Sequence, residues 1–318
     1  MSIQSVLPET AIPDDATLQA VEETAVLAAR KAGEFVAERF GGPLEVMQKA
    51  VREGVDIVTD ADKAAQELIV SIIHDKFPDH MVLGEEDPPD TEPPAPDFIW
   101  AVDPIDGTKN FVNGSPVHAV SVGVLYRGAA VAGAIWTPWP SAAGFTIAHA
   151  RSGNGAWMNG AKLDVSTADG DSDGVPNAGR LTAIPGGLNW TYDIKKPLRG
   201  NLGEVRITGS VCYEMLMVAT GSMQYAISGF ANVWDYAAGI AIVREAGGIT
   251  LTPQSSSNWR GLSGWSDLFN GDAETSKRLR AWKGPVLSGP PALARFVASN
   301  LGLKQPGLLK RVWKSVKS

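Results

Sequence analysis

Residues 100–111 read Trp-Ala-Val-Asp-Pro-Ile-Asp-Gly-Thr-Lys-Asn-Phe, and the fold prediction starts from this stretch. The apolar run at residues 98–102, which leads into it, has the length and bulk of a buried strand. Asp103 and Asp106 follow directly, with Pro104 between them. Because proline fixes its own φ and lacks a backbone donor, we expect a rigid bend that brings the two carboxylates together.

The two residues after Asp106 complete the motif. Gly107 lets the backbone come close to a ligand, and Thr108 can begin a helix whose free N–H groups favour an anion such as phosphate. Asp, Pro and Gly are also ordinary turn residues, so a solvated acidic turn is the alternative for this stretch alone. Two acids around a stiff bend, followed by Gly-Thr, exceed what a turn needs and favour metal and phosphate chemistry.

Composition limits the class of protein. The chain has 318 residues, of which 44% are hydrophobic, so it can bury the core of one large domain or two ordinary ones. Its single cysteine, Cys212, excludes an internal disulfide framework and fits a reducing compartment. The net charge of −7 argues against a protein that coats a nucleic acid polymer. With no signal-peptide pattern and no long apolar segment, we expect a cytoplasmic protein without a membrane span.

The segment from Lys304 to the end is an exception, because it is basic and amphipathic. A short helix of this kind could contact a membrane surface or a partner. More often such a segment caps its own protein or frays, so it does not enter the functional prediction.

Hydrophobic periodicity predicts two halves. Residues 1–165 are expected to form an N-terminal α+β half with an antiparallel sheet and most metal-binding motifs, and residues 166–318 a C-terminal α/β half with substrate contacts and the last metal ligand. Helices are predicted at residues 15–40, 60–77, 212–219 and 235–246. Strands are predicted within residues 43–58 and at 81–83, 98–102, 117–125, 130–136, 145–148, 181–184, 204–207, 224–227 and 249–251.

Acidic residues recur where these predicted elements end or begin. Glu85 follows a strand, Asp103 and Asp106 follow another, and Asp235 lies where a helix begins after a loop. No histidine or cysteine lies beside them in the sequence, so zinc has no evident ligand set. Oxygen ligands alone suit Mg²⁺ or Mn²⁺.

A site of carboxylates and divalent ions has a direct route to phosphate hydrolysis. The metals would hold the phosphoryl oxygens, lower the pKa of a bound water and stabilise the leaving oxygen. A covalent aspartyl-phosphate is the rival mechanism, as in the haloacid-dehalogenase pattern. That pattern separates its two acids by one residue, whereas two residues separate Asp103 from Asp106, and the spacing disfavours the rival.

Three motifs together resemble the inositol monophosphatase family, in order over roughly residues 20–300. They are Gly84-Glu85-Glu86, then Asp103-Pro-Ile-Asp-Gly-Thr108 with Asn110-Phe111, then Trp234-Asp235 with Glu245-Ala-Gly-Gly248. The resemblance implies an α+β fold with an α/β second half, arranged as the layered αβαβα sandwich of the inositol monophosphatase and fructose-1,6-bisphosphatase type. It also implies a homodimer.

The resemblance further implies the roles of individual residues. One Mg²⁺ would be held by Glu85, Asp103 and the Ile105 carbonyl, and a second by Asp103, Asp106 and Asp235, with a third, weaker ion near Glu85 and Mn²⁺ as a substitute. Asp62, Glu85 and Thr108 would be catalytic, with Asp62 and Thr108 orienting the attacking water. Lithium would compete at the second metal position. Substrate contacts are expected from Gly107, Thr108, Lys109, Gly209, Ser210 and Ser228.

Two departures leave the substrate open. Inositol-selective members carry a glutamate seven residues before the last metal-binding aspartate, where this chain has Ser228. Lys109 resembles the nucleotide-phosphate and histidinol-phosphate branches. An inositol-1-phosphate-like monoester is expected, with 3′-phosphoadenosine 5′-phosphate, fructose 1,6-bisphosphate and histidinol phosphate as alternatives. A non-catalytic scaffold is disfavoured because every matched ligand position keeps its acid.

Overall fold

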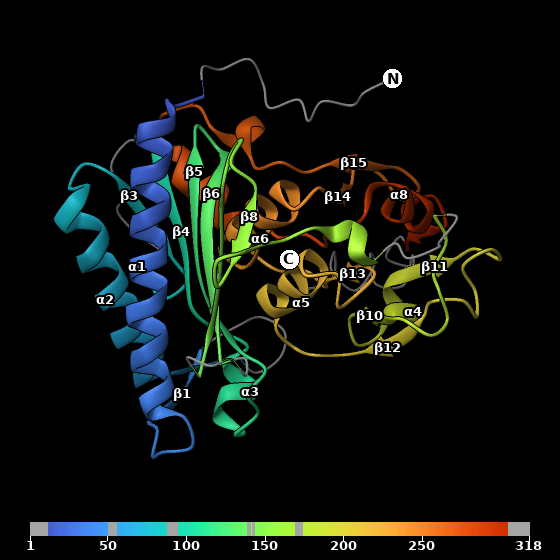
Figure 1. Cartoon of the computed structure of the whole chain (residues 1–318), viewed down its shortest axis with the longest axis horizontal. Coiled ribbons are helices and arrows are strands. Elements are labelled where there is room, and N and C mark those ends of the chain that lie inside the picture. Colours follow the sequence, from blue (N-terminus) through green and yellow to red (C-terminus); the bar gives the residue numbers. More distant parts are fainter. Residues whose placement is uncertain are drawn as a thin grey trace, which may run out of the picture.

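Five layers of helices and sheets make up the fold in a computed structural model that describes residues 12–49, 56–87, 95–138, 141, 144–168 and 174–304. Helices α1 and α2 cover one face of a seven-stranded sheet, and α5 and α6 cover the other face (Figure 1). A six-stranded sheet packs on the far side of α6, and α8 packs on that sheet. The predicted layered αβαβα sandwich is therefore confirmed.

The outer helices begin where the sequence predicts. Helix α1 (Asp15–Arg39) has Asp14 as its N-cap, whose side chain accepts a 2.7 Å hydrogen bond from the Thr17 N–H. Helix α2 (Asp60–Lys76) has Thr59 as its N-cap. Both present an apolar stripe at three-four spacing to the sheet.

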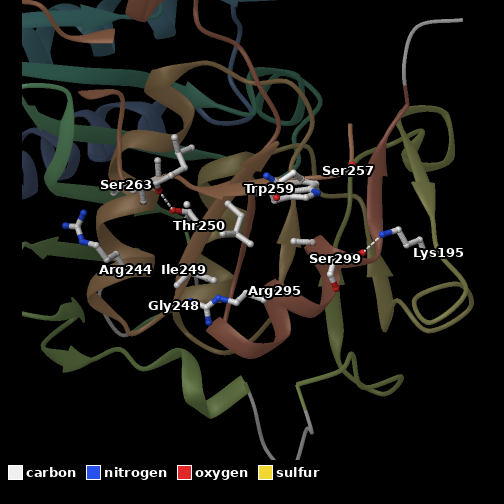
Figure 2. A pocket seen from close by; sticks show the side chains of 16 residues that line it. Lys195, Arg244, Gly248, Ile249, Thr250, Ser257, Trp259, Ser263, Arg295 and Ser299 are labelled. Atoms are coloured by element: carbon white, nitrogen blue, oxygen red, sulfur yellow. Dashed lines mark hydrogen bonds between the residues drawn. The ribbon is translucent and has the colours of Figure 1, made fainter. Parts of the chain in front are cut away.

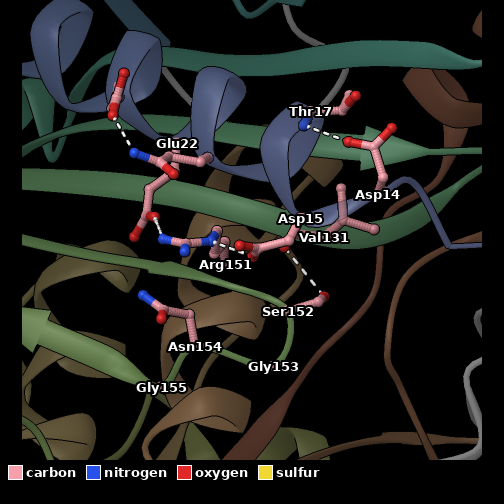
Figure 3. Close-up of polar contacts among 12 residues, drawn as sticks. Asp14, Asp15, Thr17, Glu22, Val131, Arg151, Ser152, Gly153, Asn154 and Gly155 are labelled. Carbon is pink, nitrogen blue, oxygen red and sulfur yellow. Dashed lines mark hydrogen bonds and ion pairs between the residues drawn. The ribbon is translucent and has the colours of Figure 1, made fainter.

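A cluster of ion pairs holds α1 against the seven-stranded sheet (Figure 3). The Arg151 guanidinium lies between Glu22 and Asp15 of α1, at 2.7 and 3.0 Å. His149 Nδ1 is 2.7 Å from the other Glu22 carboxylate oxygen. Burial raises the pKa of Glu22, but the bonds from His149 and Arg151 outweigh it and hold the pKa below its ordinary value.

The seven-stranded sheet follows the predicted meander. Only its first two strands are parallel, and the others pair antiparallel in chain order. The strands are β3 (Met81–Gly84), β4 (Phe98–Asp106), β5 (Ala119–Tyr126), β6 (Ala129–Thr137), β7 (Thr146–Arg151), β8 (Ala156–Met158) and β9 (Ala161–Lys162). A tight turn at Asn159-Gly160 joins β8 to β9 with φ of 50° and 82°, as an Asn-Gly pair favours.

Strand β4 corrects one expectation. The chain was expected to leave the strand at Asp103, but β4 continues to Asp106 and pairs with β5 across a register shift between these two residues. A shift of this kind re-aims side chains without ending the ladder. Helix α3 (Thr108–Val112) then begins, as predicted, after Gly107 with a φ of 87°.

The second sheet has the order β12-β10-β13-β16-β14-β15. Its members are β10 (Leu181–Ala183), β12 (Glu204–Arg206), β13 (Ala226–Ile227), β14 (Ile249–Pro253), β15 (Trp259–Gly261) and β16 (Leu287–Gly289). The helices of this half are α4 (Leu188–Thr191), α5 (Val211–Ala219), α6 (Val233–Glu245), α7 (Glu274–Ala281) and α8 (Pro291–Ser299). Two two-stranded sheets, β1 (Val46–Lys49) with β2 (Asp56–Thr59) and β11 (Tyr192–Ile194) with β17 (Leu301–Leu303), and the 3₁₀ helices Val165–Ala168 and Ser266–Leu268 complete the described elements.

One hydrophobic cluster includes residues of both predicted halves, from Met81 to Val286. The division at residue 165 stays a prediction. Residues 50–55, in the middle of the region predicted to hold strands, and the whole of the basic segment after Lys304 lie outside the described residues. Among the described helices, none combines the length and the apolarity needed to cross a bilayer.

Candidate active site

Three carboxylates from two distant parts of the chain meet at the ends of β4 and α6. Asp103, Asp106 and Asp235 place carboxylate oxygens within 4.8 Å of one another. Asp103 and Asp106 are buried, and Asp235 keeps part of its surface open to solvent. The structure therefore brings together three of the predicted metal ligands.

The first turn of α5 holds Asp106. The backbone N–H groups of Val211 and Cys212 donate to its carboxylate at 3.2 and 2.7 Å, and the Ser210 hydroxyl donates to the same group. Ser210 is also the N-cap of α5 and is 1% exposed. Its predicted substrate contact stays a prediction, and in the structure the Ser210 hydroxyl is hydrogen-bonded to the Asp106 carboxylate.

Backbone donors hold the other two acids. The Ile105 N–H donates to Asp103 at 3.0 Å. Asp235 lies in the first turn of α6, where it accepts from the Asn232 N–H as part of a capping box. The carboxylates of Asp103 and Asp235 are thus held by backbone N–H groups close to them in the sequence.

Burial and mutual repulsion raise the pKa values of all three acids. Burial, followed by the charge of Glu85, raises the pKa of Asp103 well above its ordinary value. Burial raises the pKa of Asp106 to about 6, despite its donors, and raises that of Asp235 to about 8 together with the charges of Asp106 and Glu85. Such a cluster is costly without a cation.

Asp62 and Thr108 form a second polar group beside the cluster. The Thr59 N–H donates to Asp62 at 2.7 Å, which holds the carboxylate at the start of α2. The Thr108 hydroxyl lies 3.2 Å from Asp62 and 3.0 Å from the Ile105 carbonyl oxygen, so it can donate to either. Burial raises the pKa of Asp62.

Glu85 lies in the turn after β3, and its charge acts on all of these acids. Two neighbours hold that turn: Gln66 of α2 donates to Asp87 at 2.7 Å, and Arg280 of α7 donates to the Gly84 carbonyl at 2.9 Å. A Cβ on Gly84 would lie 2.4 Å from the Gln66 amide, so a larger residue there would displace the Gln66 side chain from its present contacts. Neither Gln66 nor Arg280 was predicted to act at the site, because their contacts with the turn after β3 arise from tertiary packing.

The predicted phosphate contacts lie around the start of α3. A Cβ on Gly107 would lie 3.1 Å from the Val117 carbonyl and 3.2 Å from Ser210 Cβ, which places the segment containing Gly209 beside it. Asn110, quoted in the motif but given no role, donates to the carbonyls of Val117 and Thr208 at 2.7 and 2.8 Å. It joins the two segments.

Lys109 and Ser228 differ in surroundings. Lys109 is exposed next to Thr108, as a contact at the rim of the site requires. Ser228 is 5% exposed, and its hydroxyl contacts the Tyr236 hydroxyl at 2.7 Å and donates to the Val286 carbonyl at 2.9 Å. The proposed effect of Ser228 on selectivity therefore depends on the space it leaves rather than on a hydroxyl open to solvent.

The donor set fits a hard divalent cation. All three ligands are carboxylates, and no histidine or cysteine joins them within the part of the chain that the structure describes. The Cys212 thiol is buried and faces the Asp235 carbonyl oxygen at 3.1 Å, so it contributes no free ligand. A cation would relieve the repulsion that raises the three pKa values.

Comparison with known proteins agrees with this geometry. The sequence profile of the inositol monophosphatase family matches residues 17–303. Phosphatase IMPL1, chloroplastic, of Arabidopsis thaliana is 34% identical over 228 residues, which are 71% of this chain but only 60% of that protein. The Fructose-1,6-bisphosphatase/inositol-1-monophosphatase of Aquifex aeolicus (strain VF5) is 31% identical over 233 residues, 71% of this chain and 83% of that protein.

A solved structure extends the agreement to the fold. The extragenic suppressor protein suhB from Bartonella henselae superposes with a TM-score of 0.66 at 26% identity, over 88% of this chain and 97% of that one. The match to the family profile covers nearly the whole of the described chain. The chain therefore belongs to the inositol monophosphatase family of phosphatases.

Proposed function

We propose that this chain is a Mg²⁺-dependent phosphatase that hydrolyses small phosphate monoesters, with inositol 1-phosphate among those it accepts. The observation that carries the proposal is the cluster of Asp103, Asp106 and Asp235 within 4.8 Å. Three carboxylates at this spacing have no structural use that would repay their repulsion, whereas a phosphate site needs bound cations.

The residues divide the work. Asp103, Asp106 and Asp235 would hold one Mg²⁺, and Glu85, Asp103 and the Ile105 carbonyl another, with a third ion near Glu85. Mn²⁺ offers the same preference for oxygen ligands. When bound, these ions supply the positive charge that draws the phosphate in and favours loss of a proton from water. The N–H groups of Gly107 and Thr108 would donate to the phosphate.

Asp62 and Thr108 would orient the attacking water. The Thr108 hydroxyl has acceptors at 3.2 Å in Asp62 and 3.0 Å in the Ile105 carbonyl, so its hydrogen is held and its oxygen can accept from water. The raised pKa of Asp62 brings that carboxylate closer to the range in which it can take a proton.

Substrate selectivity is expected to be modest. A hydroxyl-rich leaving group binds best to an anionic acceptor, and Ser228 is short, neutral and engaged by Tyr236. Lys109 could meet a second anionic group. Fructose 1,6-bisphosphate, 3′-phosphoadenosine 5′-phosphate and histidinol phosphate are thus alternative substrates, and the Aquifex relative is named for two such activities.

The test is phosphate release by the purified chain from these four esters at one Mg²⁺ concentration. Asp103→Asn keeps the shape of the side chain but removes its charge, and we expect at least a ~10³-fold loss of kcat. Asp97→Asn, just before the same strand, is the matched control and should retain full activity. Turnover by Asp103→Asn near the parent rate, or undiminished activity in EDTA, would exclude this mechanism.

Three further properties follow the same proposal. Lithium should inhibit by competing with Mg²⁺ where Asp103, Asp106 and Asp235 meet, because a monovalent ion there supplies too little charge. Titration of lithium against Mg²⁺ checks this.

We also propose that the chain forms a homodimer and lies in the cytoplasm. Sedimentation of the purified chain would test the first statement, and fractionation of cells the second.

A further inference from the structure

A cavity lies at the other end of α6 from the acids. Its volume is about 770 Å³, and it is lined by residues of β14, β15, α8 and the end of α6 (Figure 2). Asp235 is in the first turn of α6, whereas Arg244 at this cavity is in the last. Nine residues of helix separate the two by roughly 13 Å, so the cavity is not part of the acid site.

The floor of the cavity is apolar and leaves space for a ligand. Leu251 of β14 pairs with Gly261 of β15, the edge strand of its sheet, and a Cβ on Gly261 would meet nothing within 4 Å. The Trp259 indole N–H donates to the Leu301 carbonyl at 3.1 Å, and this hydrogen bond holds the Trp259 ring in place on β15, the strand that also carries Gly261. A flat apolar group would therefore find a preformed surface beside Trp259 and Leu251.

Every charged residue that lines the cavity is a cation. These residues are Lys195, Arg244 and Arg295, in a chain whose net charge is −7. The Arg244 guanidinium donates to the Ala130 carbonyl and the Ser152 hydroxyl at 2.7 and 2.9 Å and points away from the cavity in Figure 2. Lys195 and Arg295 are exposed, and within the described part of the chain their hydrogen-bond acceptors are backbone carbonyls at 2.6 and 3.4 Å.

We propose that this cavity binds a small organic anion with a flat apolar body. The body would lie against Trp259, Leu251 and the space above Gly261, and the anionic group would reach Arg295 and Lys195. Charge selects against the chain's own C-terminal segment as the occupant, because residues 304–318 carry five cations and no acid.

The probe is naphthalene-1-sulfonate, which has no phosphate ester to hydrolyse, with 1-naphthalenemethanol as its neutral counterpart. Calorimetric titration of the full chain in EDTA should show the sulfonate bound at least about fivefold more tightly than the alcohol. Gly261→Leu should abolish binding by filling the open space. The double change Arg295→Gln with Lys195→Gln should weaken sulfonate binding about tenfold and leave binding of the alcohol unchanged.

Matched controls are Gly179→Leu and Arg199→Gln, which are exposed outside the cavity and should bind like the parent. Asp103→Asn should also bind normally, which separates this site from the acid site. The proposal is overturned if the sulfonate does not bind, or if Gly261→Leu binds it as the parent does. It is also overturned if binding appears only after residues 305–318 are removed, since those residues would then be the occupant.

Discussion

Asp106 accepts hydrogen bonds from one side-chain hydroxyl and two backbone N–H groups. Ser210 donates to its carboxylate, and this bond lowers the pKa of Asp106 against the effect of burial, which raises it to about 6. Ser210→Ala should therefore raise that pKa, so that Mg²⁺ must displace a proton at neutral pH. We expect the acid limb of the activity profile to move to higher pH and the half-saturating Mg²⁺ concentration at pH 7 to rise about tenfold.

Ser210→Ala also removes the N-cap of α5, which costs about 1 kcal/mol of stability. Asp14→Ala is the matched control, because it removes the N-cap of α1 far from the acids. It should lower the melting temperature similarly but leave the Mg²⁺ dependence unchanged. An equal shift in Mg²⁺ dependence for both variants would show that lost stability, not the bond to Asp106, is responsible.

The acids were predictable from their residue type and their position together. Each follows a strand or begins a helix, and a turn at such a place does not by itself require a charged residue. The partners of the acids were less predictable. Ser210 was assigned to the substrate, but a serine before an apolar run is also an N-cap, and only the fold shows that Asp106 lies at that helix end. The buried contacts of Ser228 with Tyr236 and Val286 likewise come from tertiary packing.

Among the elements, α7 acts on the site through its last turn. Arg280 donates to the Gly84 carbonyl at 2.9 Å, pairs with Asp87 at 3.2 Å and lies 5.8 Å from the centre of the Trp234 ring. It thereby links the turn that carries Glu85 to the start of α6. Arg280→Ala should loosen both, and we expect kcat/KM to fall about tenfold and half-saturating Mg²⁺ to rise.

The Arg280→Lys variant tests whether the planar shape of the Arg280 guanidinium matters or only its positive charge. Lysine keeps the cation but lacks the planar fork, so it should restore only part of the Mg²⁺ affinity. Lys277→Ala on the same helix, which pairs with Glu274 at the exposed surface, is the control and should behave like the parent. If Arg280→Ala lowers the melting temperature while Mg²⁺ dependence stays the same, Arg280 is only structural.

Helix α7 also marks where prediction of elements from the sequence ends. The long helices α1, α2 and α6 and the meander were predicted because each carries enough residues for a clear period. No element was predicted between residue 251 and the basic segment from Lys304, although β15, α7, β16, α8 and β17 lie there. Helix α7 has no side-chain cap and a strongly charged sequence, and β16 has three residues. Elements this short form because their neighbours cover them.

At the scale of the molecule, α6 packs between the two sheets and contacts β4, β5, β6 and β14. Its first turn therefore lies where β4 ends, which brings Asp235 to Asp103 across more than a hundred residues of sequence. The periodicity of the sequence predicts the layers, but it does not say which strand end faces which helix end. The resemblance of the motifs supplied that information.

The stability of the whole chain should report the charge held at this meeting point. Without Mg²⁺, the pKa values of Asp106 and Asp235, about 6 and about 8, exceed those of ordinary unfolded aspartates, near 3.9. Between these limits the folded chain binds more protons than the unfolded chain, so the free energy of unfolding falls as pH rises. Glu214, raised to about 8 by burial, acts in the same direction. Buried His118, lowered to about 4, acts in the opposite direction only below about pH 6.5.

In EDTA, the melting temperature should fall as the pH rises from 6.5 to 8. In saturating Mg²⁺ it should fall much less, because the metal replaces the protons on Asp106 and Asp235. A small fall should remain, because Mg²⁺ does not replace the proton on Glu214. Thermal scans at matched pH, with and without Mg²⁺, measure this difference directly.

Asp235→Asn removes the group with the higher of the two pKa values and should flatten the curve of melting temperature against pH in EDTA, whereas Asp193→Asn, exposed on β11, should leave that curve unchanged. A stabilisation by Mg²⁺ that stays constant or shrinks as pH rises would mean that the ion does not bind to these carboxylates.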